Sequence, residues 1–98
     1  MAQLDVYKTS LGEYLLDFQA DLLSHLNTRF VIPLANPTNG PQPAVRLNPQ
    51  FEIDGQTMVL YTQFAMTVPV SDLATHIVSL DDRRFEIIAA FDMLISGF

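Results

Sequence analysis

The chain has 98 residues, of which 49% are hydrophobic and 16% charged, and it contains no cysteine. This length and composition predict one folded domain over residues 1–98, and they exclude a disordered chain, disulfides and thiolate sites. The formal net charge of −6 disfavours direct binding to nucleic acid and favours a protein partner with a basic surface.

The N-terminal residues have neither a basic region nor an apolar stretch. No segment reaches the roughly 20 apolar residues that span a bilayer. We therefore expect no signal peptide, no contact with a membrane and a cytoplasmic protein.

Strand signals occupy the first 70 residues. Two short alternating runs, 3–7 and 14–18, predict a pair of strands joined by a loop. The continuously apolar run 30–34 predicts a third strand. Pro33 has no N–H donor, so we expect it at an edge, a strand end or a bulge.

A loop and a hairpin are predicted next. The proline-, asparagine- and glycine-rich residues 36–43 indicate a loop inside the domain. Asp54-Gly55 lies between two apolar runs and accepts the positive φ values of a type I′ turn, which predicts a β-hairpin. Residues 65–70 predict one more strand, interrupted by Pro69.

The apolar period changes near the C-terminus. Apolar residues recur there at every third or fourth position, which predicts one helix over about 79–96. The stripe expected to face the core consists of Phe85, Ile88, Phe91, Leu94 and Ile95, and it is widened by Ile87, Ala90 and Met93. Ser79 is the expected N-cap with Asp82 as its partner, and Gly97 should end the helix.

The apolar tail, Leu94 to Phe98, leaves two interpretations open. It either folds back onto the sheet as core or forms an exposed anchor for another protein. Phe98 follows Gly97, so it is the residue expected to point away from the domain. A patch combining Leu22 or Leu23 with the tail would indicate an interface, whereas one exposed leucine would not.

The sequence shows no pattern typical of catalysis. His25 and His76 are not joined by any motif to each other or to further ligands. Asp81 and Asp82 are better explained as helix-start residues than as an acid and base pair. No glycine-rich phosphate loop is present. We expect no enzyme activity, no cofactor and no metal.

Four segments together resemble the CcdB family over nearly the whole chain. They are Leu16-Asp17-Phe18-Gln19-Ala20-Asp21-Leu22-Leu23, Arg29-Phe30-Val31-Ile32-Pro33-Leu34, Leu47-x-Pro49 with Ile53, and Val68-Pro69-Val70. No single motif is specific, but their order and spacing are. The members of this family are plasmid and chromosomal toxins that poison DNA gyrase.

The resemblance implies a fold and a set of partners. The fold would be mainly β with one C-terminal helix: an SH3-like, partly open β-barrel of the CcdB and MazF type with a small second sheet. The chain would form a homodimer, bind the gyrase A subunit and trap the cleaved-DNA complex. A CcdA-like antitoxin would neutralise it, and the pair would repress its own operon, so that operator DNA is bound only through the antitoxin.

The resemblance also implies a gyrase-binding set of residues. Carried over by position, this set is Ala20, Leu22, Leu23, Asp92, Ile95, Ser96, Gly97 and Phe98. The family's prototype has tryptophan at the position of Ser96 and asparagine at the position of Asp92. These departures remove a large anchor and add a charge, and Phe98 is the residue expected to compensate.

Two other functions remain open. One is a MazF-type endoribonuclease on the same fold, although the net charge opposes an RNA channel and no arginine is paired with a serine or threonine on MazF spacing. The other is a degenerate relative that binds the antitoxin without poisoning gyrase.

Overall fold

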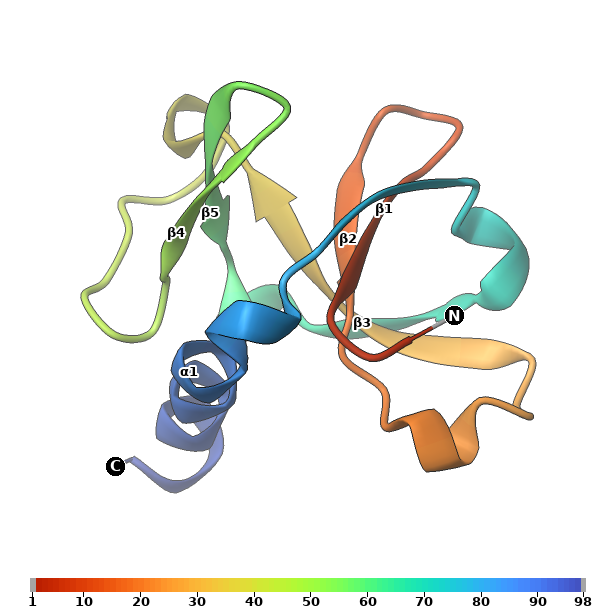
Figure 1. Cartoon of the computed structure of the whole chain (residues 1–98). Coiled ribbons are helices and arrows are strands. Elements are labelled where there is room, and N and C mark those ends of the chain that lie inside the picture. The colour runs from red at the N-terminus through yellow and green to blue at the C-terminus, as the bar shows by residue number, and fades with distance from the viewer. Residues whose placement is uncertain (1, 98) are drawn as a thin grey trace.

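Seven strands and one α-helix follow one another in residues 2–97, the part of the chain that the computed structural model describes (Figure 1). The strands are β1 Asp5–Lys8, β2 Tyr14–Asp17, β3 Thr28–Ala35, β4 Gln50–Ile53, β5 Gln56–Leu60, β6 Met66–Pro69 and β7 Thr75–Ser79, and the helix is α1 Arg84–Ser96. Single 3-10 turns lie at η1 Asp21–Leu23, η2 Pro37–Asn39, η3 Thr62–Phe64, η4 Val70–Asp72 and η5 Asp81–Arg83. The expected mainly β chain with one C-terminal helix is confirmed.

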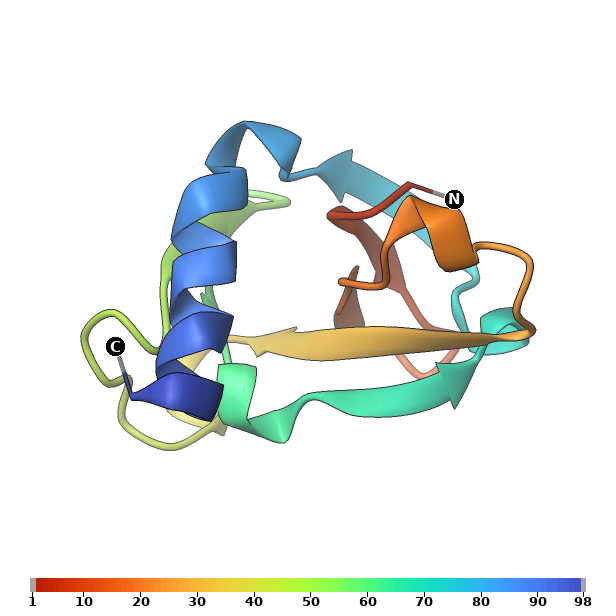
Figure 2. The same ribbon diagram turned by 90° about the horizontal axis from the view of Figure 1, so that it is seen from below.

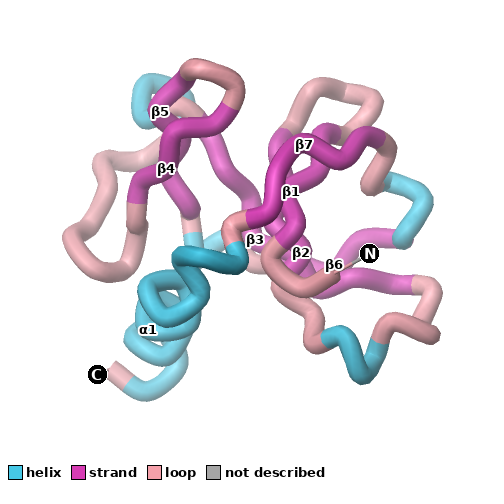
Figure 3. The backbone as a smooth tube through the Cα atoms, viewed as in Figure 1, coloured by secondary structure: helices cyan, strands magenta, loops and turns pink. Residues whose placement is uncertain are grey.

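All the strands join one antiparallel sheet in the order β4-β5-β3-β2-β1-β7, and β6 pairs with the first half of β3. The sheet curls into an open half-barrel, with α1 beside the β4–β5 hairpin (Figures 1 and 3). The expected small second sheet is not separate. The β4–β5 hairpin continues the main sheet through the pairs Leu34 with Leu60 and Ala35 with Val59.

The predicted pair of N-terminal strands is confirmed, with Val6 opposite Leu16. The apolar residues of the central strands divide between two faces, because successive side chains of a strand point to opposite sides. The inner cluster, which also takes in Ile87 of α1, includes Val6, Leu16 and Ile32. The outer cluster consists of Tyr7, Leu15, Val31, Val68 and Leu73. Every residue of β2 is buried because both faces of the sheet are covered there.

Pro33 lies within β3 and not at its end. Its carbonyl accepts a hydrogen bond from the Tyr61 N–H at 3.0 Å, so its backbone polar groups face the side of β5 and β6. On that side β6 pairs with residues 28–31 and β5 pairs with residues 34–35, so Pro33 occupies the break between them. A missing N–H therefore costs no ladder hydrogen bond at this position.

The Asp54-Gly55 turn joins β4 and β5, as predicted. Its residues have φ values of 53° and 74°, which are those of a type I′ turn. The strand predicted at 65–70 is β6, which ends at Pro69. The loop predicted at 36–43 holds no strand and contains η2.

The start of the C-terminal segment differs from the prediction. Thr75–Ser79 forms β7, a strand that pairs with β1, and Ser79 is its last residue and not a helix cap. The Ser79 hydroxyl accepts from the Asp81 N–H at 3.2 Å, within the η5 turn. Helix α1 begins at Arg84, and its N-cap residue makes no side-chain capping bond. The β-branched residues of this segment extend the sheet because β1 offers them a free edge.

The predicted core side of the helix is confirmed at Ile87 and Ala90 and was wrong at Phe85. Ile87 and Ala90 are the buried residues of α1, whereas Phe85 is 87% exposed. Phe91 is half-buried, and its ring lies 5.1 Å from that of Phe18. Apolar residues occur on more than one side of this helix, so the pattern could not identify the side that faces the sheet.

Candidate partner-binding surface

The C-terminal turn of α1 presents an exposed apolar side chain on a regular helix end. Ile95 is 67% exposed, and Asp92 and Ser96 are exposed beside it. The Ser96 hydroxyl donates to the Asp92 carbonyl at 2.6 Å. Gly97 has φ 80° and donates its N–H to the Met93 carbonyl at 3.0 Å, so it ends the helix in the left-handed conformation, as predicted.

The electrostatic potential at this helix end is negative. The last turn of α1 contains no basic residue. The unpaired carbonyls of a helix C-terminus carry partial negative charge, to which the Asp92 carboxylate adds. A binding partner of this turn therefore gains from positive charge next to an apolar contact. Phe98, the predicted anchor, lies outside the described residues.

The η1 turn presents a second apolar group. Leu22 is 87% exposed and Leu23 is 43% exposed, and Ala20 before them is exposed as well. Leu26, which the sequence interpretation did not include, is also exposed, and its N–H donates to the Leu23 carbonyl at 3.2 Å. The sequence signal that could have identified Leu26 is its spacing, three residues after Leu23 and four residues after Leu22. The turn is a cluster of leucines with no covering element in the described chain.

Buried polar groups hold the stem of η1 in place. The Gln19 side chain accepts from the Phe30 N–H at 3.0 Å and donates to the Leu23 carbonyl at 2.9 Å. The Gln19 N–H donates to the Asp17 carboxylate at 3.2 Å. Arg29 donates to the other oxygen of that carboxylate. Each hydrogen bond restricts the turn, so the exposed leucines sit on an ordered support.

A second set of contacts ties η1 to the start of α1. The Gln3 N–H donates to the Asp21 carboxylate at 2.6 Å, and its side-chain amide donates to the Phe18 carbonyl at 3.0 Å. Arg84 reaches the Gln3 side-chain oxygen at 2.8 Å and forms an ion pair with Asp81 at 2.5 Å. The N-terminal segment thus bridges the leucine turn and the helix.

The predicted site residues fall into two groups within one chain. Ala20, Leu22 and Leu23 belong to η1 and the residue before it, and Asp92, Ile95, Ser96 and Gly97 belong to the end of α1. The η1 turn (orange) and the C-terminal end of the helix lie apart in Figure 1 and in Figure 2. One copy of the chain therefore does not assemble the predicted residues into one continuous patch.

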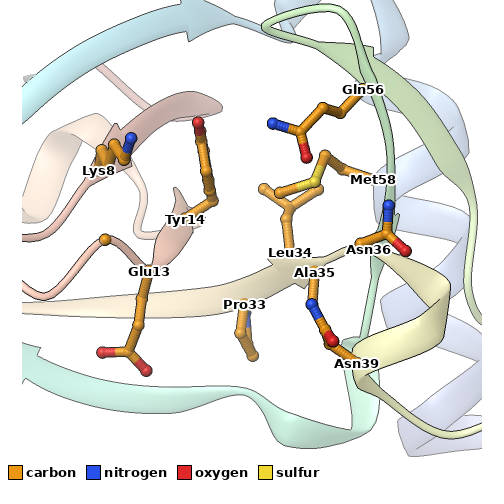
Figure 4. Close-up of a pocket in the computed structure, with 11 residues that line it drawn as sticks. Lys8, Glu13, Tyr14, Pro33, Leu34, Ala35, Asn36, Asn39, Gln56 and Met58 are labelled. Carbon is orange, nitrogen blue, oxygen red and sulfur yellow. The ribbon is translucent and has the colours of Figure 1, made fainter.

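A concave pocket of about 440 Å³ lies between β1, β2, β3 and β5. Figure 4 shows Tyr14, Leu34, Met58 and Gln56 directed toward the same space, whereas Glu13 points the opposite way from Tyr14. The Tyr14 hydroxyl donates to the Asp54 carboxylate at 2.8 Å. Among the described residues, Lys8 is the one cation of the lining and no histidine belongs to it. The pocket can form hydrogen bonds with a polar ligand, but it holds no facing pair of acid and base.

Two buried groups have shifted pKa values. Burial raises the pKa of the Asp17 carboxyl, and the hydrogen bonds and positive charge of Arg29 oppose this shift. Burial also raises the pKa of Tyr7, and the carboxylates of Asp5 and Asp17 add to the effect. Both groups lie inside the domain and face no open cavity, so they belong to the fold and not to a reaction site.

The two histidines do not form a centre. His76 lies on β7, where its Nε2 is 3.3 Å from the Asp5 carboxylate and its ring meets Tyr7 edge-on. His25 lies in the exposed segment after η1. Within residues 2–97, no three histidine, aspartate or glutamate side chains gather where they could hold a metal ion. None of the helices in that range has the length and apolar character to cross a bilayer.

Comparison with known proteins identifies a family and a fold. The sequence profile described as "CcdB protein" matches residues 3–97. Two solved structures share the fold. The Mycobacterium tuberculosis toxin MazF-mt6 has a TM-score of 0.78 at 16% identity, with 93% of this chain and 95% of that chain covered. An endoribonuclease from Mycobacterial species has a TM-score of 0.79 at 12% identity, with 97% and 90% covered.

At these identities the structural likeness concerns the fold alone, and it confirms the expected partly open barrel of the CcdB and MazF type. No curated protein matches the sequence closely enough to count as a relative.

Proposed function

The chain belongs to the CcdB family of toxins, and from that premise we propose that it binds the A subunit of DNA gyrase and traps the enzyme with its DNA cleaved. The observation that carries this proposal is the pair of exposed apolar groups on ordered supports. Leu22 extends from a hydrogen-bonded turn, and Ile95 extends from a regular helix end. Rigid apolar side chains lose little entropy on binding and are suited to anchor a protein partner.

The active form is a homodimer in this proposal. The η1 group and the helix-end group lie apart in one chain (Figure 2). A second copy supplies another η1 group and another helix end, so two chains present each apolar group twice. In such a symmetric interface each residue is used twice.

Regulation in this proposal comes from a CcdA-like antitoxin. The antitoxin covers the toxin and blocks or releases it from gyrase, and the complex represses its own operon. DNA is contacted through the antitoxin, because the toxin's charge of −6 repels phosphates. A module of this kind serves plasmid maintenance when it is carried on a plasmid.

The gyrase contact must work without the prototype's tryptophan. Ser96 is small, and its hydroxyl already bonds the Asp92 carbonyl. The apolar contact therefore falls to Ile95 and to Phe98 beyond it. The Asp92 carboxylate requires a basic or hydrated partner group, since burying an unpaired charge is costly.

The toxin acts by binding and not by catalysis in this scheme. Among the described residues, the pocket of Figure 4 is lined by one lysine, a phenol and amide groups, and its one carboxylate, that of Glu13, points the opposite way from Tyr14. These groups lack the positioned proton donor and acceptor that cleavage of RNA requires. The fold shared with endoribonucleases does not by itself transfer their activity.

The test is a measurement of binding between the purified protein and the gyrase A subunit. We expect Leu22→Ala and Ile95→Ala each to weaken binding about tenfold or more, as for interface anchors of about 1.4 kcal/mol or above. Phe85→Ala is the matched control, because Phe85 is equally exposed but lies at the other end of α1. Its affinity for gyrase should stay unchanged.

Two other outcomes would redirect the assignment. Cleavage of RNA by the purified protein would replace this proposal with the endoribonuclease function. Binding of an antitoxin without any binding of gyrase would identify a degenerate relative.

A further inference from the structure

The half-barrel leaves two free strand edges that face each other. Within the described residues β4 and β7 each pair with one strand only, and they end the strand order of the sheet. A cavity of about 480 Å³ lies between them, lined by Gln50, Phe51 and Glu52 on one side and by Val78 and Ser79 on the other. Figure 3 shows where β4 and β7 lie in the half-barrel. We call this cavity the β4–β7 slot.

The backbone of β4 directs unpaired polar groups into the slot. In a hairpin with a two-residue turn, the residues flanking the turn form a hydrogen-bonded pair, and bonded pairs then alternate along the strands. Ile53 and Gln56 flank the turn, and the Leu60 N–H donates to the Pro49 carbonyl at 2.9 Å. Gln50 and Glu52 are therefore the residues whose N–H and C=O groups point away from β5.

The β4 edge is more regular than the β7 edge. The four pairs of β4 with β5 run without interruption. The pairing of β7 with β1 shifts register between Val6 and Tyr7, which distorts that strand. Irregular edges resist the addition of another strand, whereas a regular edge accepts it. An incoming strand therefore pairs with β4, and β7 forms the opposite wall.

The walls of the slot combine apolar and acidic groups. Phe51 and Leu80 line its buried side, and Val78 is partly exposed. Glu52 and Asp82 are exposed and acidic, and neither forms an ion pair within the described chain. Within residues 2–97 the slot lining also contains one cation, Arg83, which is already engaged, because it bonds Glu86 at 2.6 Å and its guanidinium lies 4.6 Å from the centre of the Phe51 ring. A ligand that enters the slot therefore meets net negative charge.

We propose that the β4–β7 slot binds an extended, basic peptide segment of a protein partner, which adds as a strand to the free edge of β4. Backbone hydrogen bonds to Gln50 and Glu52 supply affinity, and alternate side chains supply specificity. Lysine or arginine at one set of alternate positions of the peptide pairs with Glu52 and Asp82. Small apolar residues at the other set contact the buried side of the slot. The four residues of β4 fit a segment of about 13 Å.

This slot is separate from the proposed gyrase surface. The residues that line the slot include neither Leu22 nor Ile95. In Figure 1 the β4–β5 hairpin lies at the top, and the η1 turn and the C-terminal end of α1 lie at the bottom. A peptide in the slot therefore leaves Leu22 and Ile95 free. Loss of slot binding and loss of gyrase binding can be measured independently, so either proposal can fail alone.

The test uses a five-residue peptide that alternates lysine and valine, with blocked ends, and a matched peptide that alternates glutamate and valine. The whole protein is titrated with each peptide and amide hydrogen exchange is followed by NMR. We expect the lysine peptide to bind about tenfold or more tightly than the glutamate peptide. Exchange at Gln50 and Glu52 should slow on binding, whereas the Phe51 amide, already bonded to β5, should not change.

Two variants separate the backbone contribution from the charge contribution. Gln50→Pro removes an outward N–H without removing a charge and leaves the β4–β5 hydrogen bonds intact, and it should weaken the lysine peptide about tenfold. Glu52→Gln with Asp82→Asn keeps the backbone and should lower affinity severalfold. Asp72→Asn, an exposed carboxylate outside the slot, is the control and should have no effect. Equal binding of the two peptides, or no slowing at Gln50 and Glu52 with peptide at millimolar concentration, would overturn the proposal.

Discussion

The guanidinium of Arg29 donates two hydrogen bonds to one carboxylate oxygen of Asp17, at 2.6 and 3.1 Å, and both side chains are removed from solvent. Asp17 is the last residue of β2, and its other oxygen accepts from the Gln19 N–H. The ion pair thus fixes the point where the chain leaves the sheet for the η1 turn. A buried charge left without its partner is costly, so both residues are needed together.

Asp17→Asn should lower the free energy of unfolding by about 3–5 kcal/mol, because it leaves the Arg29 charge buried without a counterion. Urea denaturation at neutral pH measures the change. Glu13→Gln, which alters an exposed carboxylate, is the control and should change stability by about 0.5 kcal/mol or less. Equal effects of the two substitutions would mean that the Arg29 charge finds solvent in the folded protein.

The loss of stability at high pH should depend on Tyr7. Its pKa lies above the ordinary value of 10.0, so above that pH the unfolded chain releases a proton that the folded chain keeps. Stability therefore falls as pH rises from 10.0 toward the raised pKa, since the unfolded state binds fewer protons there. Tyr7→Phe cannot ionise and should lose less stability over this range.

Urea denaturation of both proteins at about pH 8 and about pH 11 tests the prediction for Tyr7. The difference in unfolding free energy between the wild type and Tyr7→Phe should shift in favour of the variant at the higher pH. Parallel losses in the two proteins would show that Tyr7 ionises alike in the folded and unfolded states.

Phe91→Ala should lower the free energy of unfolding by about 3 kcal/mol, because its ring contacts Phe18 and Phe30. This value is the low end for an aromatic residue in a core, since the ring is only half-buried. Phe85→Ala on the same helix removes an equally large but exposed ring and should change stability by about 0.5 kcal/mol or less. Thermal or urea unfolding of both variants measures the contrast. The reverse ranking would mean that α1 packs on the sheet with its other side.

Gln19→Ala should weaken gyrase binding although its side chain is buried and available to no partner. The substitution removes the bonds to the Phe30 N–H and the Leu23 carbonyl, which hold η1 against β3. We expect a stability loss of about 1–3 kcal/mol and a lower affinity caused by a mobile leucine turn. Amide exchange across residues 20–26 should accelerate. Unchanged affinity together with faster exchange would show that order in η1 does not contribute to binding.

Locally encoded features could be predicted from the sequence. Asp54-Gly55 accepts a turn that few other dipeptides accept, and Gly97 ends a helix in a conformation that favours glycine. Such signals depend on the residues themselves and on their immediate neighbours. The hairpin, the helix end and the mainly β class therefore follow from the amino-acid sequence alone.

Features set by tertiary pairing could not be predicted in this way. Strand β7 forms because β1 offers an edge, and Pro33 is tolerated because β5 and β6 leave a break beside it. The buried side of α1 depends on where the sheet lies, so Phe85 was placed in the core by a pattern that fitted two sides of the helix. These outcomes involve residues far apart in the chain.

The candidate site could be predicted only at the level of exposed residues. Leu22 and Ile95, singled out by the apolar pattern and by the family resemblance, are exposed. The η1 turn and the end of α1 lie apart in one chain, so a shared interface stays a prediction. Sequence did not reveal Gln19, Gln3 or Arg29 as supports of the η1 turn, because buried polar side chains have no distinguishing pattern. The β4–β7 slot was equally hidden, since it arises from the curl of the whole sheet.

Gyrase-mediated DNA cleavage by the purified protein tests the central claim most directly. The full-length chain and a variant lacking Ser96, Gly97 and Phe98 are each incubated with gyrase and supercoiled DNA, and cleaved DNA is quantified. The proposed function predicts cleaved DNA with the full-length chain alone, while the truncated protein keeps its thermal stability because these residues follow the buried part of α1. No cleaved DNA with the full-length chain, at concentrations that saturate gyrase, would contradict the proposal that this protein is a gyrase poison.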